Sequence, residues 1–374
     1  MNTPELREQC AQQLLASLDK AKSLTAFCGL DGFVDEIVHL VDKRYDAHNF
    51  DRVPTIAKFA ERLAGAAGRS TNVEMVNKIT KLGGNGPIMA NALASFGLQV
   101  TYLGNLGYPN LHPIFDEFAK RSEVHTIAEP GHTDALEFED GKIMMGKHDS
   151  LKEVNWANIQ SRFGREKFVA KFGSADLVGF VNWTMLPYMS DIWESLQTEI
   201  CPTLSGPRRK IFFDLADPEK RKQPDILRAL ELISKFQTYF DVILGLNEKE
   251  AYEIGKVYGI TPKAQTPECL SLLAREIRKR LCIDTLVVHP VTYALAVSND
   301  TVDLADGPHV GIPLITTGAG DHFNSGFCLG KLLGLNNAMS VLTGVTTSGF
   351  YVRTAQSPTI PQLADMMRNW PVKE

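Results

Sequence analysis

Three features are scarce or missing in this chain of 374 residues, and each absence excludes a class of protein. The six cysteines are scattered without a Cys-x-x-Cys pair, which argues against a zinc site and a disulfide framework. No apolar run approaches the roughly 18 residues needed to cross a bilayer. There is no basic surplus, because the formal net charge is -5, so nucleic acid is not an expected partner. We expect a cytoplasmic protein with reduced thiols and no membrane partner.

Short apolar segments, often β-branched, alternate with longer amphipathic ones along the chain. The apolar segments predict buried strands at 24–29, 99–104, 175–182, 210–215, 240–246 and 285–290. The amphipathic segments predict helices at 53–66, 86–97, 112–121, 188–200, 222–237, 247–257, 267–281 and 319–334. This alternation is typical of an α/β protein whose mostly parallel central sheet is covered by helices on both faces.

Two strand-like segments fall outside that alternation. Residues 33–44 directly follow the first core strand, and residues 124–148 form strands around the turn Glu-Asp-Gly-Lys. They predict a small separate sheet, with an edge hairpin of the main sheet as the alternative. The sequence has no repeat, low-complexity tract or long linker, so we expect one domain over residues 1–374 with this small appendage.

The stretch Leu-Ile-Thr-Thr-Gly-Ala-Gly-Asp-His-Phe, which begins at Leu314, places a glycine turn before an apolar helix. Glycines let the backbone approach a ligand closely, and a helix N-terminus offers free N–H groups to an anion. The following carboxylate, Asp321, either caps the helix or takes a proton from a hydroxyl that attacks a bound phosphate. A dinucleotide fold also uses a glycine turn, but that turn normally follows the first strand.

This stretch resembles the C-terminal signature of the ribokinase-like (PfkB) carbohydrate kinases, and the resemblance extends over about residues 24–365. It implies the ribokinase-like fold with a small β-sheet lid formed by residues 33–44 and 124–148. It also implies that Asp321 is the catalytic base and that the backbone of Gly318, Ala319 and Gly320 forms an anion hole. Thr317, Gly318 and Gly320 would then also contact the nucleotide.

The stretch Gly-Gly-Asn-Gly-Pro, which begins at Gly83, matches the length of the family's N-terminal signature. By resemblance, Gly83, Gly84 and Asn85 contact the sugar. The alternative is a glycine turn before an ordinary core helix.

Two acids follow the first core strand, where family members carry an aspartate that binds sugar hydroxyls. Asp35 is nearest to the family position, and Asp31 lies four residues before it. Carboxylates suit this task because they accept hydrogen bonds from two neighbouring hydroxyls. The alternative is two solvated loop acids. Asn182 ends another core strand, where ligand contacts gather in open α/β sheets.

Asn247 and Glu250 resemble the family's Asn-x-x-Glu motif, which organises Mg²⁺ and its waters beside the nucleotide phosphates. Mg²⁺ keeps several waters, so contact through water is expected. The same spacing also fits a capping box at a helix start, and both roles are compatible.

Ile315 is a departure from the family, because an acid that helps hold a monovalent cation usually stands at this position. The resemblance therefore does not predict K⁺ dependence. His289 and Pro290 replace part of a glycine turn near the nucleotide, which predicts a reshaped nucleotide pocket.

The sequence thus predicts an ATP-dependent kinase of a small sugar or polyol that uses Mg²⁺. Its lid could also pair with the lid of a second copy in a homodimer. A nucleoside kinase on the same fold and a non-catalytic sugar or nucleoside sensor remain alternatives. A dehydrogenase would need a glycine fingerprint after the first strand, where this chain has the acids Asp31 and Asp35.

Overall fold

The computed structural model describes residues 2–299, 301–308 and 310–371. The two ends of the predicted domain, residue 1 and residues 372–374, lie outside this range. A nine-stranded sheet forms the centre of the molecule, in the order β14-β13-β12-β11-β10-β9-β1-β5-β6. All neighbouring strands from β12 to β6 run parallel, and only the β12–β13 and β13–β14 pairs are antiparallel. None of the helices in the described ranges combines the length and the apolar character of a membrane span.

The strands of the main sheet are β1 (Thr25–Leu30), β5 (Gln99–Gly104), β6 (Glu123–Thr126), β9 (Leu177–Phe180), β10 (Arg209–Asp214), β11 (Phe240–Asn247), β12 (Thr285–His289), β13 (Tyr293–Ser298) and β14 (Thr301–Asp306). The helices are α1 (Pro4–Ala16), α2 (Leu18–Ser23), α3 (Ile56–Gly65), α4 (Asn85–Ser95), α5 (Asp116–Ala119), α6 (Trp156–Asn158), α7 (Arg165–Ser174), α8 (Met189–Ser195), α9 (Gln223–Phe236), α10 (Glu248–Val257), α11 (Pro267–Leu281), α12 (Ala319–Leu333), α13 (Asn337–Thr354) and α14 (Ile360–Arg368).

Both faces of the main sheet are buried, because neighbouring residues of a strand point to opposite sides. Phe27 belongs to the core beneath α7, α8, α9, α10 and α11, whereas Cys28 belongs to the core beneath α1, α4, α12, α13 and α14. Phe212 and Phe213 divide between the two cores in the same way. The continuous apolar runs in the sequence reflect this double burial.

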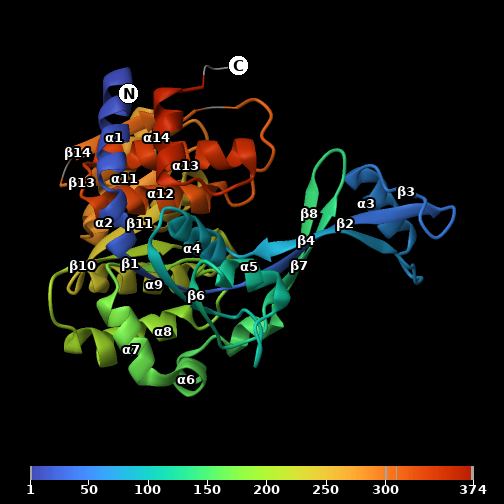
Figure 1. Ribbon diagram of the computed structural model, residues 1–374. Coiled ribbons are helices and arrows are strands. Elements are labelled where there is room, and N and C mark those ends of the chain that lie inside the picture. The colour runs from blue at the N-terminus through green and yellow to red at the C-terminus, as the bar shows by residue number, and fades with distance from the viewer. Residues whose placement is uncertain (1, 300, 309, 372–374) are drawn as a thin grey trace.

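A second sheet projects from the main body as a lid (Figure 1). Its strands are β2 (Phe33–Arg44), β3 (Phe50–Arg52), β4 (Met75–Gly83), β7 (Gly131–Glu137) and β8 (Lys142–Lys147). Only Asp31 and Gly32 separate β2 from β1 of the main sheet. One face of the lid packs on α3 through Val38, Leu40 and Phe59.

Three details differ from the sequence predictions. Residues 123–126 extend the main sheet beside β5, so the predicted lid segment 124–148 begins too early. The lid also takes β4 from residues that show no alternation. The helix predicted at 112–121 is reduced to a 3₁₀ turn, η1 (Pro113–Phe115), followed by the four residues of α5, since β6 begins at Glu123 directly afterwards.

Candidate active site

The glycine turn lies at the carboxyl edge of the parallel strands, which is the usual ligand edge of such a sheet. Gly318 has φ 92° and caps the N-terminus of α12, a conformation that favours glycine. Two cavities meet at this turn. Thr317, Gly318 and Asp321 line one of about 440 Å³. Thr316, Ala319 and Gly320 line the other, of about 340 Å³.

The backbone of the turn has free donors. The Ala319 N–H donates to the Thr316 carbonyl at 3.1 Å, so this predicted anion-hole donor is already engaged. The N–H groups of Gly318, Gly320 and Asp321 donate to no acceptor among the described residues. Free N–H groups at the start of a helix are suited to binding an anion.

Asp321 is buried at the start of α12, facing the larger cavity. Its Oδ1 accepts a hydrogen bond from Asn85 Nδ2 at 3.0 Å. Burial raises the pKa of Asp321 well above its usual range, and the charges of Asp214 and Asp31 raise it further. A base with a raised pKa holds a proton more strongly, which suits proton abstraction from a weakly acidic hydroxyl.

Asp31 is fully buried, and its carboxylate is hydrogen-bonded to other groups of the protein. Its carboxylate accepts hydrogen bonds from the backbone N–H of Asn85 at 3.0 Å and Gly86 at 2.8 Å, at the N-terminus of α4. Asn182 Nδ2 donates to it at 2.8 Å. Burial raises the pKa of Asp31 to about 6. The residue does not line the larger cavity, so its contacts make it a support for α4.

Asp35 enters the larger cavity from lid strand β2. It is paired in register with Lys81 on one side and Thr133 on the other. Burial raises its pKa, while Lys81 and a hydrogen bond with Thr133 act in the opposite direction. A Cβ on Gly83 would lie 2.5 Å from the Asp35 carboxylate, so a larger residue there would displace this carboxylate.

Asn182, Gly84 and Asn85 also line the larger cavity. Asn182 has φ 60° in the turn after β9, and its side chain is buried. While Nδ2 holds Asp31, the Oδ1 atom has no hydrogen-bond partner among the described residues. A buried acceptor without a donor is costly, and a ligand hydroxyl in the cavity would satisfy it.

Glu250 and Asn247 form the capping box that their spacing predicts at the start of α10. Glu250 Oε2 accepts the Asn247 N–H and Oε1 accepts the Asp217 N–H, both at 2.8 Å. Burial and the nearby Asp214 raise the pKa of Glu250 to about 7. Glu250 lines the larger cavity and Asn247 the smaller one. Carboxylate and amide oxygens at this junction fit Mg²⁺ with its waters.

The smaller cavity is mainly apolar. Its walls include Pro290, Val291, Phe323, Val345 and Val352, together with the predicted nucleotide residues Asn247 and Gly320. Thr317, predicted on the nucleotide side, lines the larger cavity instead.

His289 also lines the smaller cavity. Its ring packs on Phe323 with centroids 4.8 Å apart. Burial lowers its pKa to about 4, so the ring is neutral near pH 7. A Cβ on Gly320 would lie 3.2 Å from the ring, so the histidine packs directly against the glycine turn.

Asp214 adjoins the site, where its charge acts on Asp321 and Glu250, and none of the sequence motifs described above includes it. It is buried at the end of β10, where Asn324 Nδ2 donates to its Oδ2 at 2.8 Å. Burial raises its pKa to about 6. Its position at a strand end, preceding Leu-Ala-Asp-Pro, was the available signal. His148 and Lys220, which also line the larger cavity, carried no signal in the sequence.

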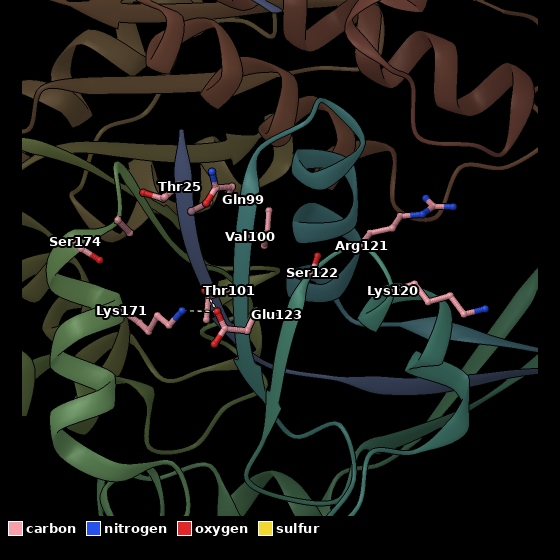
Figure 2. Close-up of a pocket in the computed structure, with 12 residues that line it drawn as sticks. Thr25, Gln99, Val100, Thr101, Lys120, Arg121, Ser122, Glu123, Lys171 and Ser174 are labelled. Atoms are coloured by element: carbon pink, nitrogen blue, oxygen red, sulfur yellow. Dashed lines mark hydrogen bonds and ion pairs between the residues drawn. The ribbon is translucent and has the colours of Figure 1, made fainter. Parts of the chain in front are cut away.

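Another cavity, of about 450 Å³, lies at the opposite edge of the sheet, where β1 and β5 begin (Figure 2). There Lys171 forms an ion pair with Glu123, and Thr101 donates to the same carboxylate at 3.3 Å. Lys120 and Arg121 extend away from this pair (Figure 2). The charged groups do not converge on one point, so this cavity is not the candidate site.

Comparisons with known proteins agree with this geometry. The model of the family described as prokaryotic ketohexokinase matches residues 1–370. The ketohexokinase of Haloferax volcanii is 30% identical over 371 residues, covering 97% of this chain and 96% of the relative.

Solved structures share the fold at low identity. The ribokinase of Arabidopsis thaliana with ribose and ATP has a TM-score of 0.63 at 13% identity, over 92% of this chain and 98% of that one. A variant of phosphofructokinase-2 from Escherichia coli has the same TM-score and coverage at 14% identity. The nucleoside kinase of Methanocaldococcus jannaschii, a member of the ribokinase family, has a TM-score of 0.59 at 14% identity, also over 92% and 98%. The chain therefore belongs to the prokaryotic ketohexokinase family, and it is a sugar kinase with the ribokinase-like fold.

Proposed function

We propose that this protein transfers the terminal phosphoryl group of ATP to a hydroxyl of a ketohexose. The observation that carries the proposal is the position of the glycine turn between a polar cavity and an apolar one. A sugar in the first and a nucleotide in the second would meet at the free N–H groups of the turn. The Haloferax volcanii ketohexokinase supports a ketohexose as the acceptor.

Asp321 is the proposed general base. It takes the proton of the attacking hydroxyl, whose oxygen forms a bond to the terminal phosphorus as the bond to the leaving ADP oxygen breaks. Asn85 donates to Asp321 Oδ1, which leaves Oδ2 to accept the substrate proton. The N–H groups of Gly318 and Gly320 hold the transferring phosphoryl oxygens, where negative charge must be stabilised.

Mg²⁺ bound through water to Asn247 and Glu250 would neutralise charge on the nucleotide phosphates. Glu250 itself links the start of α10 to the turn after β10, because its two oxygens accept N–H groups from both. The apolar walls of the smaller cavity would cover the nucleotide base.

The sugar would be held by Asp35 from the lid and by Asn182 from the main body. A bound sugar would exclude water, the competing acceptor, from the space between them. Asn85 and Gly84 line the same cavity, so the second predicted glycine turn would contact the sugar as well.

The test is a coupled ADP-release assay on the wild-type protein with a panel of ketohexoses, aldohexoses, ribose and nucleosides. We expect ketohexose-dependent ADP release that requires Mg²⁺. Faster turnover of a nucleoside than of every sugar would favour the nucleoside-kinase alternative. Nucleotide binding without transfer to any acceptor would favour the sensor.

Two further properties follow from the same proposal. All six cysteines are free thiols, four of them buried, which supports a reducing, cytoplasmic setting.

Ile79 and Met144 are about half exposed and lie in one cross-strand row with Ile37 and Ala135. A second copy of the lid would cover this row in a homodimer. A monomeric mass for the wild-type protein in multi-angle light scattering would contradict that dimer.

A further inference from the structure

Three side chains, His322, Tyr351 and Ser357, form a connected cluster beside the glycine turn, which we call the His322 clasp. His322 Nδ1 lies 2.7 Å from the Gly318 carbonyl, and Nε2 lies 2.9 Å from Ser357 Oγ. The imidazole stacks on the Tyr351 ring, with centroids 3.6 Å apart and planes inclined by 13°. The Tyr351 hydroxyl donates to the Thr317 carbonyl at 3.0 Å.

The acceptors in the clasp fix the tautomer of His322. A carbonyl cannot donate, so the proton must be on Nδ1, and Nε2 then accepts from the Ser357 hydroxyl. Asn91 Nδ2 donates to the same Ser357 oxygen at 3.3 Å, which leaves the hydroxyl proton free for His322. Burial lowers the pKa of His322 to about 4, so the ring keeps this neutral form near pH 7.

The clasp controls the orientation of the turn through the planarity of the peptide bond. In a trans peptide, the C=O and the following N–H point in opposite directions within one plane. Tyr351 holds the Thr317 carbonyl and thereby aims the N–H of Gly318. His322 holds the Gly318 carbonyl through both its Nδ1 and its backbone N–H, the latter at 3.1 Å, and so fixes the plane at which α12 begins.

Crowding leaves the turn little room to move away from this arrangement. A Cβ on Gly318 would lie 3.2 Å from the Tyr351 hydroxyl and 3.3 Å from Ile88. His322 is buried and does not line either cavity at the turn. Its contacts therefore act on the turn and not on a bound ligand.

We propose that His322 is a positioning residue for phosphoryl transfer, because it fixes the Gly318 carbonyl at the start of α12 and stacks on Tyr351, whose hydroxyl orients the peptide that carries the free Gly318 N–H. This inference rests on the proposed function, since it concerns the same anion hole. It differs from that function in naming a side chain that touches neither sugar nor nucleotide.

The experiment compares His322→Phe, which retains a ring on Tyr351 but loses both imidazole hydrogen bonds, with His322→Asn, whose amide can still donate to the Gly318 carbonyl. The control is Thr346→Val. It removes a buried hydrogen bond, away from the turn, that the Thr346 hydroxyl donates to the Leu342 carbonyl at 2.7 Å. Hydrogen–deuterium exchange over residues 316–322 and steady-state kinetics are measured on each full-length protein.

For His322→Phe we expect exchange in the turn to quicken about tenfold and kcat to fall about 10- to 100-fold. The KM values for ketohexose and MgATP should stay within about threefold, because His322 lines neither of the two cavities that would bind them. His322→Asn should recover part of both losses, and Thr346→Val should change neither.

Unchanged exchange in the turn, or a kcat for His322→Phe equal to that of Thr346→Val, would overturn the inference. An equal loss in His322→Asn and His322→Phe would also overturn it, since a merely structural ring would explain that result. Wild-type protein without ketohexose-dependent turnover would refute the proposed function, while the exchange measurement would still decide whether His322 holds the turn.

Discussion

The two cavities beside the glycine turn differ most in the charged side chains that line them. The larger one is lined by carboxylates and amides, among them Asp35, Asn182 and Asp321. The smaller one is lined by prolines, valines and a phenylalanine, together with glycines and uncharged polar residues. Even the histidines that adjoin the turn, His289 and His322, are kept neutral by burial.

This difference shows how a single turn can serve two ligands. A sugar has hydroxyls that need directional acceptors, and each acceptor must be desolvated to be selective. A nucleotide base presents a broad apolar surface that needs area more than hydrogen bonds. The glycine turn, having no side chains of its own at Gly318 and Gly320, exposes N–H groups between these two environments.

The largest effect is expected at the point where the cavities meet. Asp321→Asn removes the proposed base without changing its shape, so kcat should fall by about 10³- to 10⁴-fold. KM values for sugar and MgATP should change little. ADP-release kinetics and calorimetry for both ligands would check this. A variant that binds both ligands and turns over at more than a tenth of the wild-type rate would exclude Asp321 as the base.

Displacement of the turn should affect both cavities together. Gly318→Ala places a Cβ near the Tyr351 hydroxyl at a residue with φ 92°, so we expect kcat to fall by about 100-fold. Gly311→Ala is the matched control, because nothing lies within 4 Å of its added Cβ. Steady-state kinetics on the two proteins would separate a turn effect from a general glycine effect. Equal rates would show that the turn tolerates movement.

A change confined to the polar cavity should affect only the sugar. Asp35→Asn loses a charged acceptor from the lid, so KM for ketohexose should rise by about 10- to 100-fold with KM for MgATP unchanged. Val352→Trp is the opposite control, because Val352 lines only the apolar cavity. It should raise KM for MgATP and leave the sugar unaffected. A rise in both KM values in either variant would contradict the division between the cavities.

The smallest effect concerns stability. Asp321 has a raised pKa in the folded protein, so its contribution favours folding below the unfolded pKa near 4 and is lost as pH rises. Asp321→Asn should therefore gain stability relative to wild type as the pH rises above the unfolded pKa near 4, by up to about 1.4 kcal/mol per pH unit. Urea unfolding at several pH values would measure it. A constant difference would mean that Asp321 titrates normally.

Much of the fold could be predicted because its signals are local. The strands of the main sheet are short apolar runs, and α9, α10 and α11 begin and end within about two residues of the predicted limits. In contrast, β4 is a mostly exposed strand, Met-Val-Asn-Lys-Ile-Thr-Lys-Leu-Gly, without alternation. It becomes a strand only by pairing with β2, which is information that no local pattern contains.

The site was predictable where a motif imposes a backbone shape. Gly318 at positive φ and Asn247 with Glu250 in a capping box follow directly from their spacing. The hydrogen bond between Asn85 and Asp321, which are 236 residues apart in the chain, could not follow from spacing. The hydrogen bonds that the first N–H groups of α4 donate to the Asp31 carboxylate could not follow from spacing either. Those outcomes depend on the sheet order that brings the strand ends together.

The two-residue connection between β1 and β2 also makes the lid a good place for a spectroscopic label. The turn at residues 45–49 is exposed and lies at the distal end of the lid, far from the main body (Figure 1). A small angular change at Asp31 and Gly32 would be magnified at that distance. A fluorophore placed there would report lid orientation during turnover without touching the ligands. The exposed Cys282 would first need replacement, because it would compete for a thiol-reactive dye.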